Sequence, residues 1–304
     1  MKIVYYTSAM TGSGHIVRGI ALYNGLKRVE RRISNYTILS SSPFASLAER
    51  VRVQHLEIPF EEEDRLSPST YRASTLYSTL MDLAPDVLVV DHTWYMFYAF
   101  LDKLPFKKVF ITRQVAEAGF AIPVDGRSVR FDPELYDLAL KIEPFETDIP
   151  AVDSMEEINP VIIRNRDEIL PRSEARSRLG LQQRDDRPVC FFAFNGKPGE
   201  FETVRKSYSY LEDEGYRMVY TSNFNDGLFP LADYFNACDL LICGAGYNAF
   251  WEATYFEKEA LFVPVPRRFE SQEQRLERGA GYRFDGNGAW RNGADQLAER
   301  ILGV

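Results

Sequence analysis

The chain contains 304 residues, of which 45% are hydrophobic and 26% charged, and its formal net charge is −8. This length favours two domains over one small core, and the negative charge argues against nucleic acid as a partner, because such partners are held through their phosphates. The start MKIVYYTS lacks the apolar core of a signal peptide, and no apolar run approaches the roughly 18 residues of a membrane-spanning helix. The three cysteines lack the spacing of a disulfide framework, which suits a reducing compartment. We therefore expect a cytoplasmic protein with at most peripheral contact at the inner face of the membrane.

The first half of the chain alternates strand-like and helix-like segments. Short apolar or β-rich runs predict strands at 2–6, 36–42, 85–93 and 107–113. Apolar residues on a helical period predict a helix over 16–26. The unbroken run Val87–Val90 is typical of a strand buried on both faces, as in a parallel sheet covered by helices. This half therefore predicts a doubly wound α/β domain.

The same pattern restarts after a segment rich in proline and charge (149–180). Strands are predicted at 189–194, 215–223, 238–246 and 259–266. We place the boundary near Pro160, which divides the chain into domains 1–160 and 161–304. Two Rossmann-like, doubly wound parallel-sheet domains are then expected to face a cleft, with ligands at the carboxyl ends of the strands. The closing residues, QLAERILGV, leave little chain to cross back to the first domain.

A glycine turn follows the apolar residues Leu240–Cys243 of the third of these strands. Gly244, Ala245 and Gly246 precede a helix-like run, and backbone N–H groups at such a turn, with the positive end of the helix, suit a phosphate. Glu252 lies about two helical turns further on, where a carboxylate could accept ribose hydroxyls. A tight turn whose glycines serve packing alone has the same spacing, so the pattern leaves both interpretations open.

Two further loops carry polar groups suited to a phosphorylated sugar. The turn NGKPG (195–199) follows a strand, and Lys197 would add a point charge there, although an exposed lysine in a Pro-Gly turn is the simpler interpretation. The loop RRFESQEQ (267–274) supplies Glu270, Gln272 and Glu273, and amides with carboxylates suit hydroxyls that both donate and accept. A solvated loop would have the same composition.

Taken together, these motifs resemble GT-B glycosyltransferases, most closely the group of the lipid-linked peptidoglycan N-acetylglucosaminyltransferase and its UDP-glycosyltransferase relatives. TGSGHIVRGIALYNGL (11–26) resembles their glycine-rich loop, histidine and small-residue helix, and INPVIIRNR (158–166) resembles their Asn-Pro-Val segment. CDLLICGAGYNAFWEATYFEKEALFVPVP (238–266) and ESQEQ (270–274) match the donor-binding stretch in order and spacing. The resemblance covers nearly the whole chain. It implies a GT-B fold and a nucleotide-sugar donor, expected to be UDP-linked, with no cofactor required.

The resemblance also implies which residues bind the donor. It places the diphosphate at Gly244–Asn248, the ribose at Glu252, the sugar at Gln272 and Glu273, and the base beside Leu228 and Phe229. The full set is Gly14, Asn195, Gly196, Lys197, Leu228, Phe229, Gly244, Ala245, Gly246, Tyr247, Asn248, Glu252, Gln272 and Glu273. The chain departs from the group at Ser13, where glycine is usual, and at Glu273, where glutamine is frequent. The resemblance therefore does not extend to the identity of acceptor and sugar.

His15 is the candidate catalytic base. A histidine poised near neutral pH can take the proton of an acceptor hydroxyl as that oxygen attacks the anomeric carbon. Asp91, at the end of strand 87–90, would orient His15 and stabilise its charged form, a role known in some relatives, while His92 is the rival base and a purely structural His15 is the simpler interpretation. No Asp-x-Asp motif ends a strand, so no metal is expected, and helix dipole and loop amides would stabilise the leaving group.

The sequence thus predicts a hexosyltransferase-type enzyme that moves a sugar from a nucleotide diphosphate donor to a hydroxyl acceptor, with a lipid-linked acceptor among the options. The alternatives are a nucleotide-sugar hydrolase or 2-epimerase on the same fold, and a non-catalytic nucleotide-sugar-binding subunit. The aromatic segment 93–108 is predicted to be a helix packed on the sheet, or else a membrane contact ending in lysines. The acidic run EEED (61–64) predicts a solvated loop.

Overall fold

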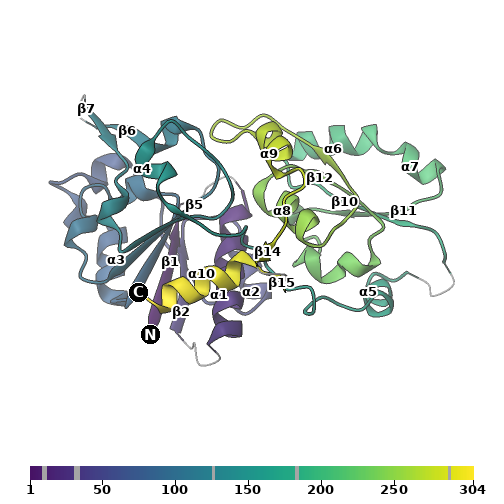
Figure 1. The fold of residues 1–304 in the computed structure, drawn as a ribbon, viewed down its shortest axis with the longest axis horizontal. Coiled ribbons are helices and arrows are strands. Elements are labelled where there is room, and N and C mark those ends of the chain that lie inside the picture. Colours follow the sequence, from purple (N-terminus) through teal and green to yellow (C-terminus); the bar gives the residue numbers. More distant parts are fainter. Residues whose placement is uncertain (9–11, 31–34, 125–126, 182–184, 287–288) are drawn as a thin grey trace. The chain divides into compact units, whose positions relative to one another are not determined.

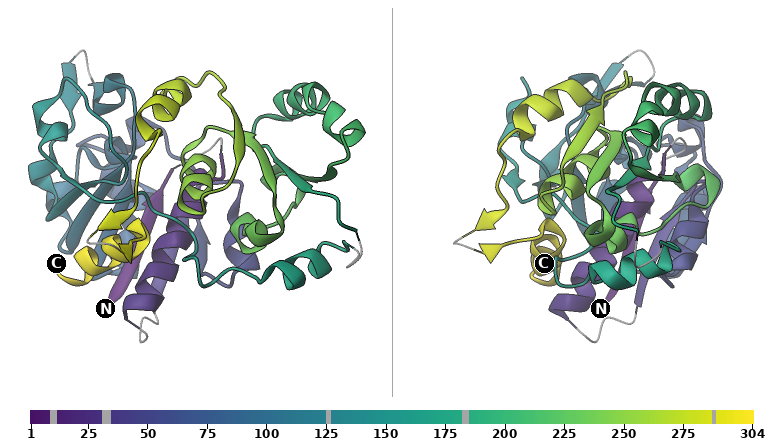
Figure 2. Two further views of the ribbon diagram at one scale, coloured as in Figure 1. Left: turned by 45° about the vertical axis from the view of Figure 1, so that its right-hand side comes forward. Right: turned by 90° about the vertical axis from the view of Figure 1, so that its right-hand side faces the viewer.

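The computed structural model describes residues 1–8, 12–30, 35–124, 127–181, 185–286 and 289–304. Residues 9–11, which belong to the predicted glycine-rich loop, lie outside the described residues. The chain forms two compact units (Figures 1 and 2). Unit 1 contains Met1–Val161, Arg268–Ser271 and Gly293–Val304, and unit 2 contains Ile162–Arg267 and Gln272–Asn292.

A fully parallel sheet forms the centre of unit 1 (Figure 1). Its strands follow the order β3-β2-β1-β4-β5-β8-β9, and every neighbouring pair among them is parallel. The bounds are β1 (Lys2–Thr7), β2 (Asn35–Ser40), β3 (His55–Glu57), β4 (Val87–Asp91), β5 (Lys107–Thr112), β8 (Leu138–Lys141) and β9 (Glu156–Glu157). All four strands predicted in this half are confirmed. The order brings the carboxyl ends of β1, β4 and β5 side by side in the middle of the sheet.

Helices and short 3-10 turns connect these strands. The helices are α1 (Gly14–Val29), α2 (Ala45–Arg50), α3 (Thr75–Leu83) and α4 (Pro150–Asp153). The 3-10 turns are η1 (Glu63–Leu66), η2 (Tyr71–Ala73), η3 (Trp94–Phe97), η4 (Leu101–Lys103), η5 (Glu117–Phe120) and η6 (Pro133–Leu135). A separate antiparallel hairpin consists of β6 (Ala121–Val124) and β7 (Arg127–Arg130).

The last helix of the chain, α10 (Gly293–Leu302), belongs to unit 1 and corrects the expectation that the chain end does not return. It lies alongside α1 (Figures 1 and 2). At Gly25 of α1, a Cβ atom would come within 2.2 Å of the carbonyl oxygen of Ala294, so only glycine allows this approach. Arg28 Nε lies 2.5 Å from Asp295 Oδ1. Residues 293–304 therefore belong to unit 1, whereas the sequence boundary assigned them to the second domain.

The structure corrects two sequence interpretations in unit 1, the first for its helix and its membrane alternative and the second at Glu61. The aromatic segment after β4 is not one helix but the turns η3 and η4, and Trp94, Phe97 and Phe100 lie in the hydrophobic core, so they are not available to a membrane. In the acidic run, Glu61 is only 4% exposed. Its carboxylate accepts the backbone N–H groups of Thr75 and Leu76 at 2.7 and 2.8 Å, which satisfies the first turn of α3.

Unit 2 contains a second parallel sheet with the order β11-β10-β12-β13. Its strands are β10 (Val189–Ala193), β11 (Arg217–Thr221), β12 (Leu240–Gly244) and β13 (Ala260–Val263), as the sequence predicted. Along one face lie α6 (Pro198–Ser207) and α7 (Tyr210–Asp213), where Val204 and Leu211 join a core with Phe192 and Ile242 (Figure 1). The other elements are α5 (Arg172–Arg178), η7 (Asn223–Asn225), η8 (Leu231–Ala237), α8 (Tyr247–Tyr255), α9 (Gln272–Gly279), β14 (Asp285–Gly286) and β15 (Ala289–Trp290).

None of the helices in the described part of the chain is both long enough and apolar enough to cross a membrane.

Candidate functional site

The structure brings His15 and Asp91 together in unit 1. His15 follows the first residue of α1, and Asp91 is the last residue of β4, which pairs directly with β1. His15 Nδ1 lies 2.7 Å from Asp91 Oδ2, with the two side chains 17% and 0% exposed. An ionised carboxylate only accepts, so a hydrogen bond between these two atoms requires the tautomer with its hydrogen on Nδ1, and in that tautomer Nε2 keeps a lone pair. This is the arrangement that a general base needs.

Two further side chains hold the Asp91 carboxylate, and sequence reasoning missed both. Arg18 Nη2 lies 3.0 Å from Oδ1 and 2.8 Å from Oδ2, and the Tyr5 hydroxyl also donates to Oδ2. Arg18 and Tyr5 are buried. The available signal was an arginine three residues after His15 in the apolar first part of the helix, because residues three apart share a helix face.

The charges around this pair set its protonation. Burial by itself would raise the pKa of Asp91, but Arg18 and then His15 outweigh it and hold that pKa far below its usual value. For His15, burial lowers the pKa, and Arg18 and Arg113 act in the same direction, whereas Asp91 opposes them. The net direction is downward, so His15 is neutral at physiological pH and able to accept a proton.

His92, the rival base, lies in a different setting. Its backbone is left-handed, with φ +63°, and its Nδ1 lies 3.1 Å from Thr112 Oγ1. Burial, followed by the positive charge of Arg113, lowers its pKa to about 3. His92 therefore stays neutral at all physiological pH values, and it makes an edge contact with the Phe120 ring.

In unit 2, the predicted diphosphate turn connects β12 to α8. Gly246 is the N-cap of α8 in an extended conformation, so the backbone N–H groups of the first helical turn begin here. Buried Arg275 of α9 donates from Nη1 to the carbonyl oxygen of Ala245 at 3.0 Å, which fixes this turn from behind. Gln272 is buried too; its Oε1 accepts Val265 N at 3.0 Å, and its Nε2 lies next to Gly246. Tyr247 is buried and Asn248 half-buried.

Glu252 occupies the second turn of α8 and is 9% exposed. No hydrogen bond to its carboxyl group is present among the residues that the structure describes. Burial raises the pKa of Glu252 to about 8; Asp233 adds to this effect, whereas Arg164 opposes it. Arg164 Nε is itself paired with Asp233 Oδ1 at 2.7 Å. A largely buried carboxyl that lacks a hydrogen-bond donor in the described chain is suited to accept hydrogen bonds from a ligand.

The remaining predicted donor residues lie in two loops of unit 2. The Asn195 side chain accepts Asn223 N at 2.7 Å and thereby holds the loop that leads to Leu228 and Phe229, both half-buried. Gly196 is required, because a Cβ there would come within 2.3 Å of the Phe194 ring. Exposed Lys197 is the N-cap of α6, and Gly14 is the first residue of α1 in unit 1.

Two acidic residues of the loop 267–274 have different surroundings. Glu270 is not available to a sugar, since its Oε2 lies 2.6 Å from Arg113 Nη1 within unit 1. Glu273, in the first turn of α9, is exposed.

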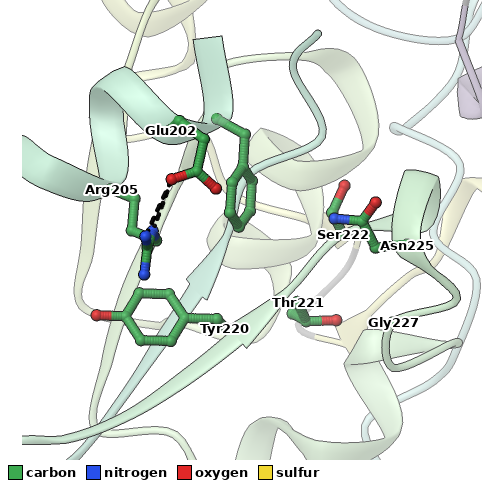
Figure 3. Close-up of a pocket in the computed structure, with 8 residues that line it drawn as sticks. Glu202, Arg205, Tyr220, Thr221, Ser222, Asn225 and Gly227 are labelled. Atoms are coloured by element: carbon green, nitrogen blue, oxygen red, sulfur yellow. Dashed lines mark hydrogen bonds and ion pairs between the residues drawn. The ribbon is translucent and has the colours of Figure 1, made fainter. Parts of the chain in front are cut away.

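A pocket of about 340 Å³ lies between α6 and β11 (Figure 3). Phe201, Glu202, Arg205, Tyr220, Thr221, Ser222, Asn225 and Gly227 line it. Arg205 pairs with Glu202 at 3.0 Å and lies over the Tyr220 ring at 5.6 Å, so these charges are satisfied by one another. None of the predicted site residues lines this pocket. Within the described ranges, no group of three or more His, Cys, Asp or Glu residues is placed to hold a metal ion.

Comparisons with known proteins identify the fold. No protein-family model matches the sequence, and no curated protein matches it by sequence. Among solved structures, the spinosyn forosaminyltransferase SpnP is 15% identical, with 100% of this chain and 90% of that chain covered and a TM-score of 0.61. The glycosyltransferase VinC in complex with dTDP is 13% identical, with 99% and 90% covered and a TM-score of 0.58. MurG of Acinetobacter baumannii is 13% identical, with 100% and 90% covered and a TM-score of 0.52. The chain therefore has the GT-B glycosyltransferase fold, with two Rossmann-like α/β units.

Proposed function

We propose that this protein is a glycosyltransferase that moves a sugar from a nucleoside diphosphate donor, expected to be UDP, to a hydroxyl acceptor. Unit 2 binds the donor and unit 1 acts on the acceptor. The observation that carries the proposal is Glu252, a buried carboxyl without a hydrogen-bond partner among the described residues, two turns after a glycine turn at a strand end. Ribose hydroxyls are the donors that this group lacks.

On the donor side, the diphosphate is bound by the turn Gly244–Gly246 and the first residues of α8. The backbone N–H groups of this turn and the positive helix end stabilise the negative charge that grows on the leaving group during transfer. Gln272 beside Gly246, with Glu273, contacts the sugar, and Leu228 and Phe229 flank the base. Asn195, Gly196 and Lys197 complete the diphosphate site, so no metal is needed for charge neutralisation.

On the acceptor side, His15 is the general base. Its Nε2 accepts the hydroxyl proton while the acceptor oxygen forms a bond to the anomeric carbon of the donor sugar. The bond from that carbon to the diphosphate oxygen breaks, and its electron pair leaves with the nucleoside diphosphate. Asp91, 2.7 Å from Nδ1, stabilises the imidazolium formed in this step. A hydrolase would use water in place of the acceptor, and a non-catalytic subunit would bind the donor without turnover.

The test combines a binding panel with one variant. Calorimetry with UDP, GDP and dTDP identifies the nucleobase of the donor. UDP is expected to bind most tightly, and dTDP is the main alternative because the VinC structure contains it. Release of UDP from UDP-glucose and UDP-N-acetylglucosamine, with and without simple alcohols or a lipid-linked hydroxyl compound, then separates transferase from hydrolase activity.

His15→Ala is expected to leave UDP affinity unchanged, because unit 2 holds the diphosphate, and to lower turnover by roughly 10²–10⁴-fold. His55→Ala is the matched control, since His55 bonds to Ser40 Oγ at 2.8 Å in the same unit. A stable His15→Ala protein with full turnover would exclude the base role. Failure of all three diphosphates to bind would exclude the function itself.

We also propose that the protein acts in the cytoplasm. The three cysteines are free and buried, which suits a reducing compartment. Fractionation of cells with a tagged chain tests this, and recovery with the membrane fraction would favour a lipid-linked acceptor.

A further inference from the structure

Arg18 is a buried charge for which the proposed reaction has no direct use. Its side chain is 1% exposed and lies on α1 one helical turn after His15. Arg18 Nε and Nη2 lie 3.1 and 2.8 Å from Asp91 Oδ2. A guanidinium is always charged and only donates, so Arg18 and Asp91 form a permanent ion pair with no net charge. Burial of such a pair is costly, and replacement by apolar side chains would commonly stabilise a protein as much.

Arg18 and Asp91 both contact the same atom of His15. Nδ1 lies 2.7 Å from Asp91 Oδ2 and 2.6 Å from Arg18 Nη2. Nδ1 either donates its hydrogen to Asp91 or accepts one from Arg18. In the first state Nε2 keeps the lone pair that a base needs, and in the second state Nε2 carries the hydrogen. An ionised carboxylate is a stronger acceptor than a neutral ring nitrogen, so the state that holds Arg18 on Asp91 is also the base-competent one.

We propose that Arg18 is a positioning residue of the His15–Asp91 pair. Its guanidinium holds the ionised Asp91 carboxylate against Nδ1, and its charge keeps His15 neutral until a hydroxyl delivers a proton to Nε2. The inference deepens the proposed function, because it rests on His15 as the base. Its electrostatic part can be tested on the protein without any ligand.

The charged and titratable groups facing His15 come from several elements of unit 1. Arg18 lies on α1, Asp91 ends β4 with His92 after it, Tyr5 lies on β1, and Arg113 follows β5. Tyr5 is neutral because burial raises its pKa well above the usual value. Asp91 and Arg18 cancel, and Arg113 is paired with Glu270 at 2.6 Å. Removal of Arg18 therefore exposes His15 to the charge of Asp91, and removal of Asp91 exposes it to the cation of Arg18.

The experiment compares Arg18→Met with Asp91→Asn in the full chain. Proton NMR follows the titration of His15, which is assigned with His55→Gln and His92→Gln because the chain has three histidines. The midpoint of His15 is expected to move to higher pH in Arg18→Met and to lower pH in Asp91→Asn. Arg28→Met is the matched control, since Arg28 lies further along α1 and pairs with Asp295. Its His15 midpoint is expected to equal that of the wild type.

The same variants are assayed for release of UDP from saturating UDP-glucose across pH. The acid limb of kcat is expected to follow the NMR midpoint, and turnover on that limb changes about tenfold for each unit of displacement, because the neutral fraction does so. Arg18→Lys keeps the charge but loses the bidentate contact with Asp91. We therefore expect a titration midpoint of His15 near that of the wild type, with lower maximal turnover. A midpoint in Arg18→Met that does not rise would overturn the inference.

The double variant Arg18→Met/Asp91→Asn protects the test against a failure to fold, because it leaves no unpaired buried charge. Its midpoint is expected to lie above that of Asp91→Asn. Equal midpoints in these two proteins would show that Arg18 does not act on His15, and the inference would fall. If the NMR midpoints move as expected but kcat does not follow them, Arg18 positions His15 as stated and the base role in the proposed function is wrong.

Discussion

Replacement of Glu252 tests the donor site at its most unusual group. Its pKa is raised to about 8 by burial and by Asp233, against the opposing charge of Arg164. At pH 7 an acid with this pKa is ionised in roughly a tenth of the molecules, and at pH 9 in roughly nine tenths. Ribose hydroxyls donate best to the ionised form. UDP affinity of the wild type is therefore expected to rise about tenfold between pH 7 and pH 9, with close to one proton released per UDP bound at pH 7.

Two substitutions separate the contact from the titration. At pH 9, where Glu252 is ionised, Glu252→Ala removes charge-assisted hydrogen bonds worth about 1.5 to 3 kcal/mol, which weakens UDP binding roughly 10- to 150-fold. Glu252→Gln keeps the shape without the titration, so its affinity is expected to be flat from pH 7 to pH 9. Glu257→Gln is the control, since the Glu257 side chain is 62% exposed just beyond the end of α8 and pairs with Arg166.

Isothermal titration calorimetry in two buffers of different ionisation enthalpy measures both the affinity and the proton release. Unfolding free energy gives a check without ligand. The folded carboxyl holds its proton up to about pH 8, whereas the unfolded one loses it near pH 4.5. Stability should therefore fall as pH rises through this window, by up to about 1.4 kcal/mol per unit, in the wild type but not in Glu252→Gln. Constant UDP affinity in Glu252→Ala, with no pH dependence in the wild type, would refute the role of Glu252.

Two further predictions concern unit 1. The pKa of His92 is lowered to about 3, so between about pH 6.5 and pH 3 the unfolded chain binds a proton at this side chain and the folded chain does not. Acidification through this range should therefore lower the free energy of unfolding of the wild type by up to about 1.4 kcal/mol per pH unit more than that of His92→Asn, in which asparagine tolerates the left-handed backbone. Urea unfolding across pH measures both slopes, and equal slopes would contradict the prediction. Gly25→Ala should lower the free energy of unfolding by about 1 to 3 kcal/mol, because the new Cβ atom meets the backbone of Ala294. Gly199→Ala is the control and should not lower it, since no atom lies within 4 Å of its new Cβ. Equal melting temperatures for the two variants would contradict the packing of α10 on α1.

Strands were the most predictable part of the fold. The run that became β4 and the strand before Gly244 are apolar without interruption, and such runs are local features of the sequence. The turn Gly244–Gly246 and the position of Glu252 were predictable for the same reason, because the helical period places a residue two turns after a known start.

The features that the sequence did not predict depend on distant partners. Arg18 and Asp91 are 73 positions apart, and only the pairing of β1 with β4 brings them together. Glu61 looks like part of a solvated acidic run until α3 places its N–H groups against it. Hydrophobicity marked 93–108 as buried, but 3-10 turns and an α-helix bury aromatic residues equally well. The return of α10 depends on Gly25, whose role appears only when Ala294 packs on it.

The two units handle buried charge in opposite ways, and this difference has a kinetic consequence. Asp91 in unit 1 is compensated by Arg18 and stays ionised, while burial and Arg18 keep His15 neutral at physiological pH. Glu252 in unit 2 lacks such compensation and is mostly protonated at pH 7. Because kcat/KM reports groups of the free enzyme and kcat those of the complex, the acid limb of kcat/KM for the donor is expected near pH 8 and belongs to Glu252. The acid limb of kcat belongs to His15 and lies at lower pH. Glu252→Gln should abolish the first limb and leave the second, and loss of both limbs together would show that one group governs binding and turnover.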